Sequence, residues 1–217
     1  MADVFRRDEK RIEKSERKSV VALRKLLGKT GSDSVLSSFS TFPTKVNFET
    51  QDEGEEVVLF LRQHPIVNVP WIILVIFALT IPSVFGFFPM IADLPDTYQF
   101  VLELMWYSLV FGFALAKFMS WFFNIYILTD ERVVDVDFIN LFYRVVSTAK
   151  IEEIQDLSVR SSGAFETFFN YGSVFIQTAA QVSEFEFLRV PRPDVVAKVI
   201  NQMIDQEEQE KLDGRVK

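Results

Sequence analysis

The residues of this sequence that could do chemistry are few, and their spacing forms no catalytic set. The chain of 217 residues has no cysteine, which excludes disulfides, thiolate nucleophiles and cysteine-ligated metals, and its one histidine is His64. Two pairs of adjacent carboxylates occur, Asp130 with Glu131 and Glu152 with Glu153. Adjacent residues of a strand point to opposite faces of a sheet, so neither pair can converge on a substrate. We therefore expect no catalytic activity, no metal and no cofactor.

Two long apolar stretches define the class of protein. Residues 67–88 contain no charged side chain, and residues 100–123 contain only Glu103 and Lys117, each toward one end. At ~1.5 Å of rise per residue, a helix of either length covers the ~30 Å hydrocarbon core of a bilayer. The connection between them, residues 89–99, is short and polar. The sequence thus predicts an antiparallel transmembrane hairpin.

The second stretch carries two features that could serve a function. Ionisable side chains inside a bilayer are costly, so Lys117 and Glu103 either mark a pore or extend their charges to the headgroups. Small side chains also recur every fourth residue, which would allow close helix packing. This stripe consists of Ser108, Gly112, Ala116 and Ser120. It could face the first helix or a second protomer.

The basic residues give the hairpin a direction. Twelve Lys or Arg residues precede the first span and ten follow the second, whereas the connection 89–99 has none. Basic residues favour the cytoplasmic side, so we expect a two-span protein of the plasma (inner) membrane with both termini in the cytoplasm. Arg62 and His64 would lie at the membrane entrance, with His64 as a polar interfacial residue.

The segment before the first span divides in two. Residues 1–45 combine a basic helix with a linker rich in Ser, Thr and Gly, and residues 46–66 form a lead-in to the membrane, as a strand or a short helix. The basic helix could bind anionic lipid or could be solvated, because acidic residues interleave the basic ones. The whole chain has a formal net charge of −7, which argues against a nucleic-acid partner.

After residue 123 the pattern changes to short strands separated by turns and closed by a helical repeat from residue 193. This order predicts that residues 124–217 form a cytoplasmic domain, a small β-barrel or sandwich capped by a C-terminal helix, and makes the whole chain an α+β membrane protein. An aromatic group in the middle of the domain could be an interaction patch or could fill the end of the barrel. Its members are Phe165, Phe168, Phe169 and Tyr171.

Three stretches of the domain carry a resemblance to a known family: YILTDERVV, IEEIQDLSV and FFNYGSVFIQTA. The residues at the shared positions are Tyr126, Thr129, Arg132, Ile151, Ile154, Gln155, Gly172, Val174 and Thr178. In this order, after a hairpin with the lead-in LRQHP and before a terminal helix, they resemble the bacterial pleckstrin-homology-like (bacterial PH domain) family of small membrane proteins. The resemblance covers about residues 55–203. It implies a PH-like fold, a membrane anchor and no catalysis.

The expected function is that of a membrane-anchored interaction or scaffold module on the cytoplasmic face that self-associates. Its partners would be the lipid bilayer, a second copy of the chain and a cytoplasmic protein. Two alternatives stay open: a subunit of an oligomeric channel or transporter, with Lys117 near the pore, and a binder of anionic lipid headgroups. The basic residues of the domain are scattered, which disfavours the headgroup binder. We also predict that the second helix continues into the first strand at Asn124, which would make anchor and domain one rigid unit.

Overall fold

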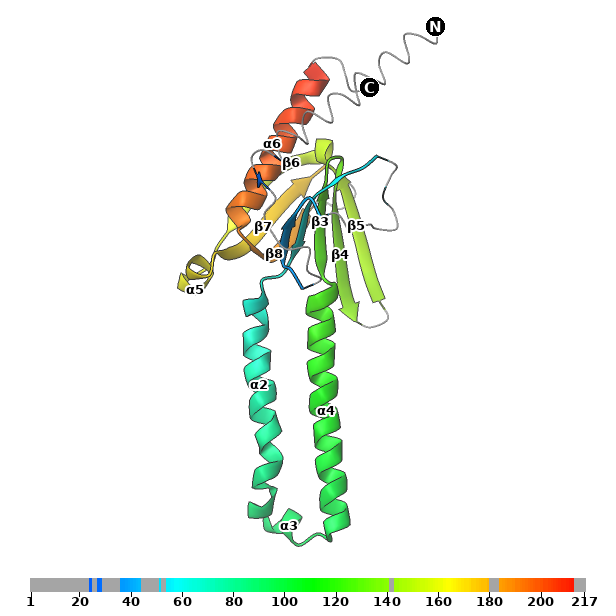
Figure 1. The fold of residues 1–217 in the computed structure, drawn as a ribbon, viewed down its shortest axis with the longest axis vertical. Helices are drawn as coiled ribbons and strands as arrows, with labels where there is room; N and C mark the ends of the chain where they lie inside the picture. The colour runs from blue at the N-terminus through cyan, green and yellow to red at the C-terminus, as the bar shows by residue number, and fades with distance from the viewer. Residues whose placement is uncertain are drawn as a thin grey trace. The chain divides into compact units, whose positions relative to one another are not determined.

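The computed structural model describes residues 24, 27–28, 36–43, 51, 54–140, 143–179 and 184–212. The chain forms two compact units (Figure 1). The first unit combines Met1–His64, Asn124–Asp137 and Val145–Lys217, and the second combines Pro65–Phe123 and Phe138–Arg144. The predicted basic helix of the N-terminal segment lies mostly outside the described residues.

Two antiparallel sheets form the first unit. One has five strands in the order β1 (Phe39–Thr41), β2 (Val57–Arg62), β3 (Ile125–Thr129), β4 (Arg132–Asn140) and β5 (Tyr143–Lys150). The other has three, β6 (Ile154–Arg160), β7 (Tyr171–Thr178) and β8 (Glu184–Pro191). The five-stranded sheet joins strands from before and after the apolar hairpin, because β2 pairs with β3 and places Leu61 opposite Tyr126.

This topology changes the domain expected over residues 124–217. Strands β1 and β2 precede the hairpin in the chain, yet they belong to the same sheet as β3. The stretch expected to be a linker therefore contains a strand, and the lead-in is a strand and not a short helix. The α+β architecture with antiparallel sheets is confirmed, whereas the alternative of a closed barrel is wrong, because the described strands pair within two separate sheets.

One hydrophobic core lies between the sheets and the C-terminal helix α6 (Pro193–Leu212). Alternating strand residues such as Phe185 and Phe187 point into it, in keeping with the two-residue period of a strand. Helix α6 adds Val196, Ile200 and Met203, which share one face at helical spacing. The predicted capping of the domain by a C-terminal helix is confirmed in this respect.

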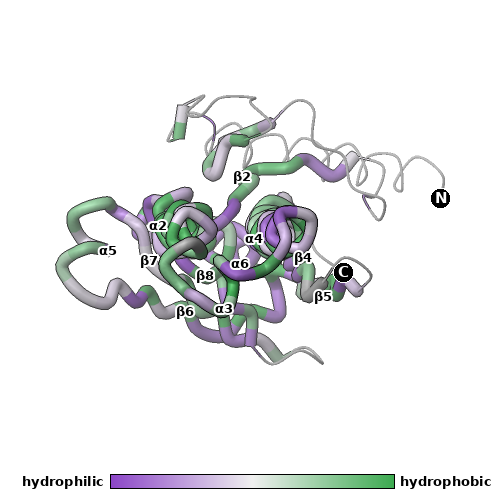
Figure 2. Tube along the Cα trace, turned by 90° about the horizontal axis from the view of Figure 1, so that it is seen from below, coloured by the Kyte–Doolittle hydropathy of each residue, from purple (hydrophilic) through white to green (hydrophobic). Residues whose placement is uncertain are grey.

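The second unit consists mainly of the apolar hairpin. Its elements are η1 (Pro65–Asn68), α2 (Val69–Thr80), η2 (Ile81–Phe87), α3 (Pro89–Ala92) and α4 (Asp96–Phe123). The α-helical part of the first stretch ends at Thr80, and Pro82 falls in the first turn of the 3-10 helix η2, where its missing N–H costs little. Two stretches, Pro65–Phe85 and Asp96–Phe123, are long and apolar enough to cross a membrane. Seen from below, α2 and α4 both contain residues coloured as hydrophobic (Figure 2).

Candidate functional site

The turn between β3 and β4 is fixed to the residues just before β2. Thr129 Oγ1 accepts the N–H of Arg132 at 2.9 Å and closes the turn. The guanidinium of Arg132 then makes two hydrogen bonds to the fully buried carboxylate of Glu55, 2.9 Å from Nε to Oε1 and 2.7 Å from Nη2 to Oε2. Two parallel bonds of this kind are the strong geometry for a guanidinium and a carboxylate. The Thr129 and Arg132 positions of the motif therefore hold the sheet together.

Asp130 makes a second connection at the same turn. Its Oδ1 accepts the N–H of Glu56 at 2.9 Å, and its own N–H donates to the carbonyl of Glu56 at 3.1 Å. Burial raises the pKa of Asp130 to about 6, although the hydrogen bond from Glu56 opposes that rise. Asp130 thus fixes the geometry of the turn.

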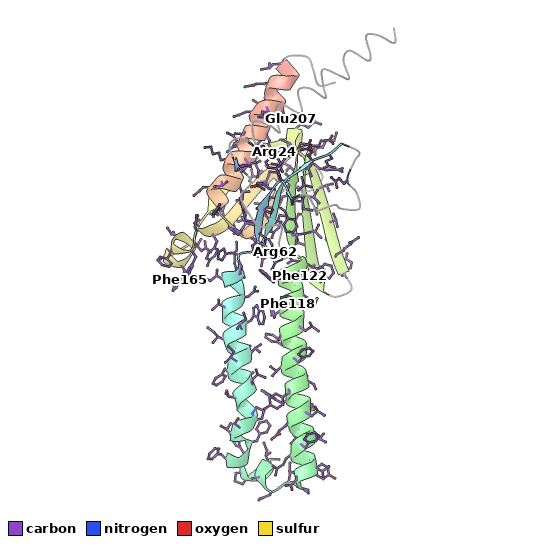
Figure 3. The ribbon with its side chains drawn as sticks, viewed as in Figure 1. Arg24, Arg62, Phe118, Phe122, Phe165 and Glu207 are labelled. Atoms are coloured by element: carbon purple, nitrogen blue, oxygen red, sulfur yellow. The ribbon has the colours of Figure 1, made fainter. Side chains whose placement is uncertain are left out.

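A cavity of about 410 Å³ opens beside this turn. It is lined by Glu131, Arg132, Thr148, Ala149, Lys150, Glu152, Glu153 and Glu207, the last of which lies on α6 (Figure 3). Nζ of Lys150 is 3.5 Å from Oε1 of Glu152. The guanidinium of Arg132 is paired with the carboxylate of Glu55. The lining is therefore acidic, and its cations are already paired, which disfavours a phosphate ligand. Within the described ranges, no three acidic or histidine side chains meet in a geometry suited to a metal ion.

The two helices of the hairpin are joined through Trp106 of α4. Its indole Nε1–H donates to the carbonyl of Ala78 on α2 at 2.9 Å, and its ring meets Phe85 edge to face at 6.4 Å between centroids. Val110, one turn further along α4, is buried. The sequence alone did not predict this contact of Trp106 between the helices. The bond satisfies an indole N–H that an apolar environment would otherwise penalise.

The stripe of small residues lies on the other side of α4. Gly112 follows the buried Val110 by two residues, which is about 200° around an α-helix. A Cβ atom added at Gly112 would meet nothing within 4 Å. Ser108 and Ala116 are exposed as well, and Ser120 is half-buried. The sequence left two partners open for this stripe, the first helix and a second protomer. At Gly112 the first helix does not contact the stripe.

The charged residues of the hairpin do not meet one another. Lys117 is exposed on α4, and its ammonium lies over the ring of Phe113, 5.8 Å from the centroid. Glu103 is half-buried more than three turns away. Phe113 lies one turn before Lys117 on α4, so this is a cation–π contact within the helix. The extension of Lys117 toward headgroups stays a prediction.

The residues expected at the membrane entrance, Arg62 and His64, belong to the first unit. Arg62 is buried at the end of β2, with its guanidinium over the ring of Phe60 at 5.6 Å from the centroid, and burial lowers its pKa. The backbone N–H of His64 donates to the carbonyl of Arg189 at 2.8 Å. Its imidazole stacks on Tyr171 with centroids 5.2 Å apart, and burial lowers the pKa of His64 as well. The last residues before the hairpin are thus fixed to β7 and β8.

The expected aromatic patch has two different parts. Tyr171 is half-buried against His64, whereas Phe165, Phe168 and Phe169 are 76%, 81% and 41% exposed. Phe165 and Phe168 belong to the short helix α5 (Ala164–Phe168), and Phe165 is labelled on that helix in Figure 3. The rings therefore do not fill the interior of the domain. The expected role of the exposed rings as an interaction patch stays a prediction.

A buried carboxylate, Asp135 on β4, was missed by the sequence reasoning. It is 8% exposed, and its Oδ1 accepts no hydrogen bond from the described residues. Burial, with Asp137 and Glu186 nearby, raises its pKa to about 7. The alternation of residues along β4 could have predicted the burial of Asp135, because Asp135 shares a strand face with Val133, which is fully buried.

The fold combines two antiparallel sheets with a C-terminal helix over a hydrophobic core. An apolar hairpin interrupts the chain between β2 and β3. The sequence matches the family model of the bacterial PH domain over residues 66–204. The match spans more than half of the chain, so the protein belongs to the bacterial PH domain family. The resemblance inferred from the three motifs is confirmed, and the match points to no catalytic family.

One solved structure is also similar in part. It is the crystal structure of a DUF1696 family protein with a pleckstrin-homology domain from Shewanella loihica PV-4, with a TM-score of 0.30 and 15% sequence identity. The similarity covers 37% of this chain and 70% of that one. No curated protein matches the sequence.

Proposed function

We propose that this protein is a non-catalytic interaction module of the bacterial PH domain family, anchored in the inner membrane by its hairpin and self-associating through α4. The observation that carries the anchor is the exposure of the hairpin. Only 11% of the apolar window of Pro65–Phe85 is buried, and 0% of that of Asp96–Phe123. Core helices of a water-soluble domain of this length would bury an apolar face against protein, whereas a bilayer solvates such surfaces.

The expected orientation can be tested by single-cysteine labelling, because the natural chain has no cysteine. Met90, at the tip of the hairpin, is 89% exposed, and Leu212, at the end of α6, is 87% exposed. We expect a membrane-impermeant maleimide to label M90C in intact cells and L212C only after permeabilisation. Both variants should remain in the membrane fraction after alkaline carbonate extraction. Release of the protein by carbonate would refute the anchor, and the reverse labelling pattern would refute the orientation.

Self-association is supported by the side of α4 that the small residues occupy. Their stripe faces away from α2 at Gly112, so it offers close backbone approach to another helix and not to the hairpin's own partner. Helices in lipid associate through such surfaces, because dispersion contacts and not hydrophobicity drive their packing. The alternative function, binding of anionic headgroups, is disfavoured at Arg132, because its guanidinium is already paired with the carboxylate of Glu55.

Disulfide cross-linking of single-cysteine variants tests this interface in membranes. We expect G112C to form a covalent dimer under mild oxidation. The matched control is F111C, because Phe111 is 69% exposed but its position is about 100° around the helix from that of Gly112. We also expect Gly112→Leu to shift the protein from dimer to monomer in detergent. Equal cross-linking at both positions, or a monomeric natural chain, would refute self-association through this stripe.

A further inference from the structure

Helix α5 holds two phenylalanine rings away from the core of the first unit. Phe165 and Phe168 are 76% and 81% exposed, while other phenylalanines of the same unit, Phe185 and Phe187, are 1% and 0% exposed. Phe165 projects from α5 in Figure 3. Exposure of rings three residues apart on one short helix leaves a concentrated apolar surface, which a fully solvated domain would avoid.

The backbone around these rings is ordered by its own hydrogen bonds. The N–H of Phe169 donates to the carbonyl of Phe165 at 3.0 Å, and the N–H of Ser162 donates to the carboxylate of Glu166. Gly163 opens the helix with φ of +94°, a conformation that suits glycine. Glu166, the one acidic residue of α5, thus engages the preceding loop by its carboxylate. The apolar surface is a built feature and not a frayed end.

The chain connects α5 closely to the start of the first apolar span. Tyr171 follows Phe168, the last residue of α5, by three residues, so their Cα atoms are at most about 11 Å apart. Tyr171 stacks on His64 at 5.2 Å between ring centroids, and the N–H of His64 donates to the carbonyl of Arg189. His64 is the residue directly before Pro65, where the span Pro65–Phe85 begins. The end of α5 is therefore only a few residues from the contact between Tyr171 and His64. His64 directly precedes the point at which the chain would enter the bilayer.

The dimensions and the charge of this region suit a lipid surface. The headgroup layer on each side of the hydrocarbon core is about 5 to 8 Å thick, so a reach of up to about 11 Å from Tyr171 to the end of α5 can span it. Aromatic side chains partition into that layer. Arg189 and Arg192 are both exposed on the chain that borders Tyr171 and Asn170, where they could meet anionic headgroups.

We propose that α5 inserts Phe165 and Phe168 into the interfacial layer of the membrane that the hairpin crosses, as a second contact of the domain with the bilayer. The proposal rests on the membrane anchor of the proposed function. The partner of α5 in this proposal is the lipid surface. Contact of α5 with another protein or with a second copy of the chain would refute it. The contact would restrict the rotation of the domain about the point where the chain leaves the membrane.

The test uses the full chain in vesicles of phosphatidylcholine and phosphatidylglycerol. Single variants F165C and F168C are labelled with an environment-sensitive fluorophore, and L212C, whose natural side chain is 87% exposed, serves as the water-exposed control. We expect the labels at 165 and 168 to show blue-shifted emission and at least twofold quenching by nitroxide-bearing lipids, with neither change at 212. F169C, from a ring that is 41% exposed, should be quenched to an intermediate degree.

The possible outcomes are separable. If the protein floats with the vesicles and the labels at 165 and 168 match the control, the anchor stands and the α5 contact is refuted. If the labels are blue-shifted but the lipid nitroxides do not quench them, protein covers α5 and the lipid contact is refuted. If the protein does not float with the vesicles, the anchor itself fails. The two phenylalanine variants are independent, and each ring is exposed, so misfolding of one leaves the other as a test.

Discussion

Asp135 makes the stability of the first unit depend on pH. Its side chain is 8% exposed on β4, and Oδ1 finds no hydrogen-bond donor among the described residues. Burial is the main reason that the pKa rises from 3.8 to about 7, and the like charges of Asp137 and Glu186 add to it. An uncompensated buried carboxylate favours its protonated form.

The perturbation is Asp135→Asn, which keeps the shape of the side chain and removes its titration. The folded protein holds the proton up to about pH 7, whereas the unfolded chain releases it near pH 4. The stability contributed by protonation is therefore complete below pH 4 and is lost as the pH rises through 7. With these two pKa values, the natural chain loses about 2 to 3 kcal/mol relative to the Asn variant between pH 5 and pH 8.

Thermal unfolding in detergent, followed by circular dichroism at pH 5, 6.5 and 8, measures this difference. We expect the midpoint of the natural chain to fall relative to that of D135N by about 5 to 10 °C between pH 5 and pH 8. D137N is the matched control, because Asp137 lies on the same strand but is exposed, and its effect should be smaller. Parallel pH curves for the natural chain and D135N would refute the assignment of this titration to Asp135.

Two further predictions concern the residues that fix the sheets. Arg132→Ala should destabilise the first unit by about 3 to 5 kcal/mol, because it leaves the buried carboxylate of Glu55 without its guanidinium, and adding Glu55→Gln should recover part of the loss in the same melting assay. Gly172→Ala should cost about 1 to 3 kcal/mol, because its Cβ would come within 2.6 Å of Ser161 Oγ and 2.9 Å of the carbonyl of Arg160. Unchanged melting of either single variant would contradict these assignments.

The periodic parts of the fold could be predicted from the sequence. The two helices of the hairpin follow from long apolar runs, and the C-terminal helix follows from apolar residues at helical spacing, such as Val196, Ile200 and Met203. The strands after residue 123 follow from alternation. These signals are local, so they do not depend on which segment pairs with which. The expected rigid connection of α4 to β3 through Asn124 stays a prediction.

The pairing of β2 with β3 could not be predicted, because it links segments on the two sides of the hairpin. The hydrogen bonds of Arg132 to Glu55 join residues 77 apart in sequence. A short run such as residues 57–62 fits a strand or a helix when it is considered alone. Its role as a strand is decided by β3, whose free edge requires a partner. The motif positions Thr129 and Arg132 were found by resemblance, and their physical role became clear only from the contacts with Glu55.

The 23 phenylalanines of this chain show the same limit of prediction from local sequence. Phe185 and Phe187 alternate with glutamates, so a strand must place them on one face, and that face is the core. Phe165, Phe168 and Phe169 have the spacing of a helical face, which ordinarily predicts burial against protein. Helix α5 is only five residues long, however, and its rings remain exposed. For a chain that continues from His64 into an apolar span, a lipid surface can replace the missing protein surface, and the same apolar spacing then indicates membrane contact instead of core packing.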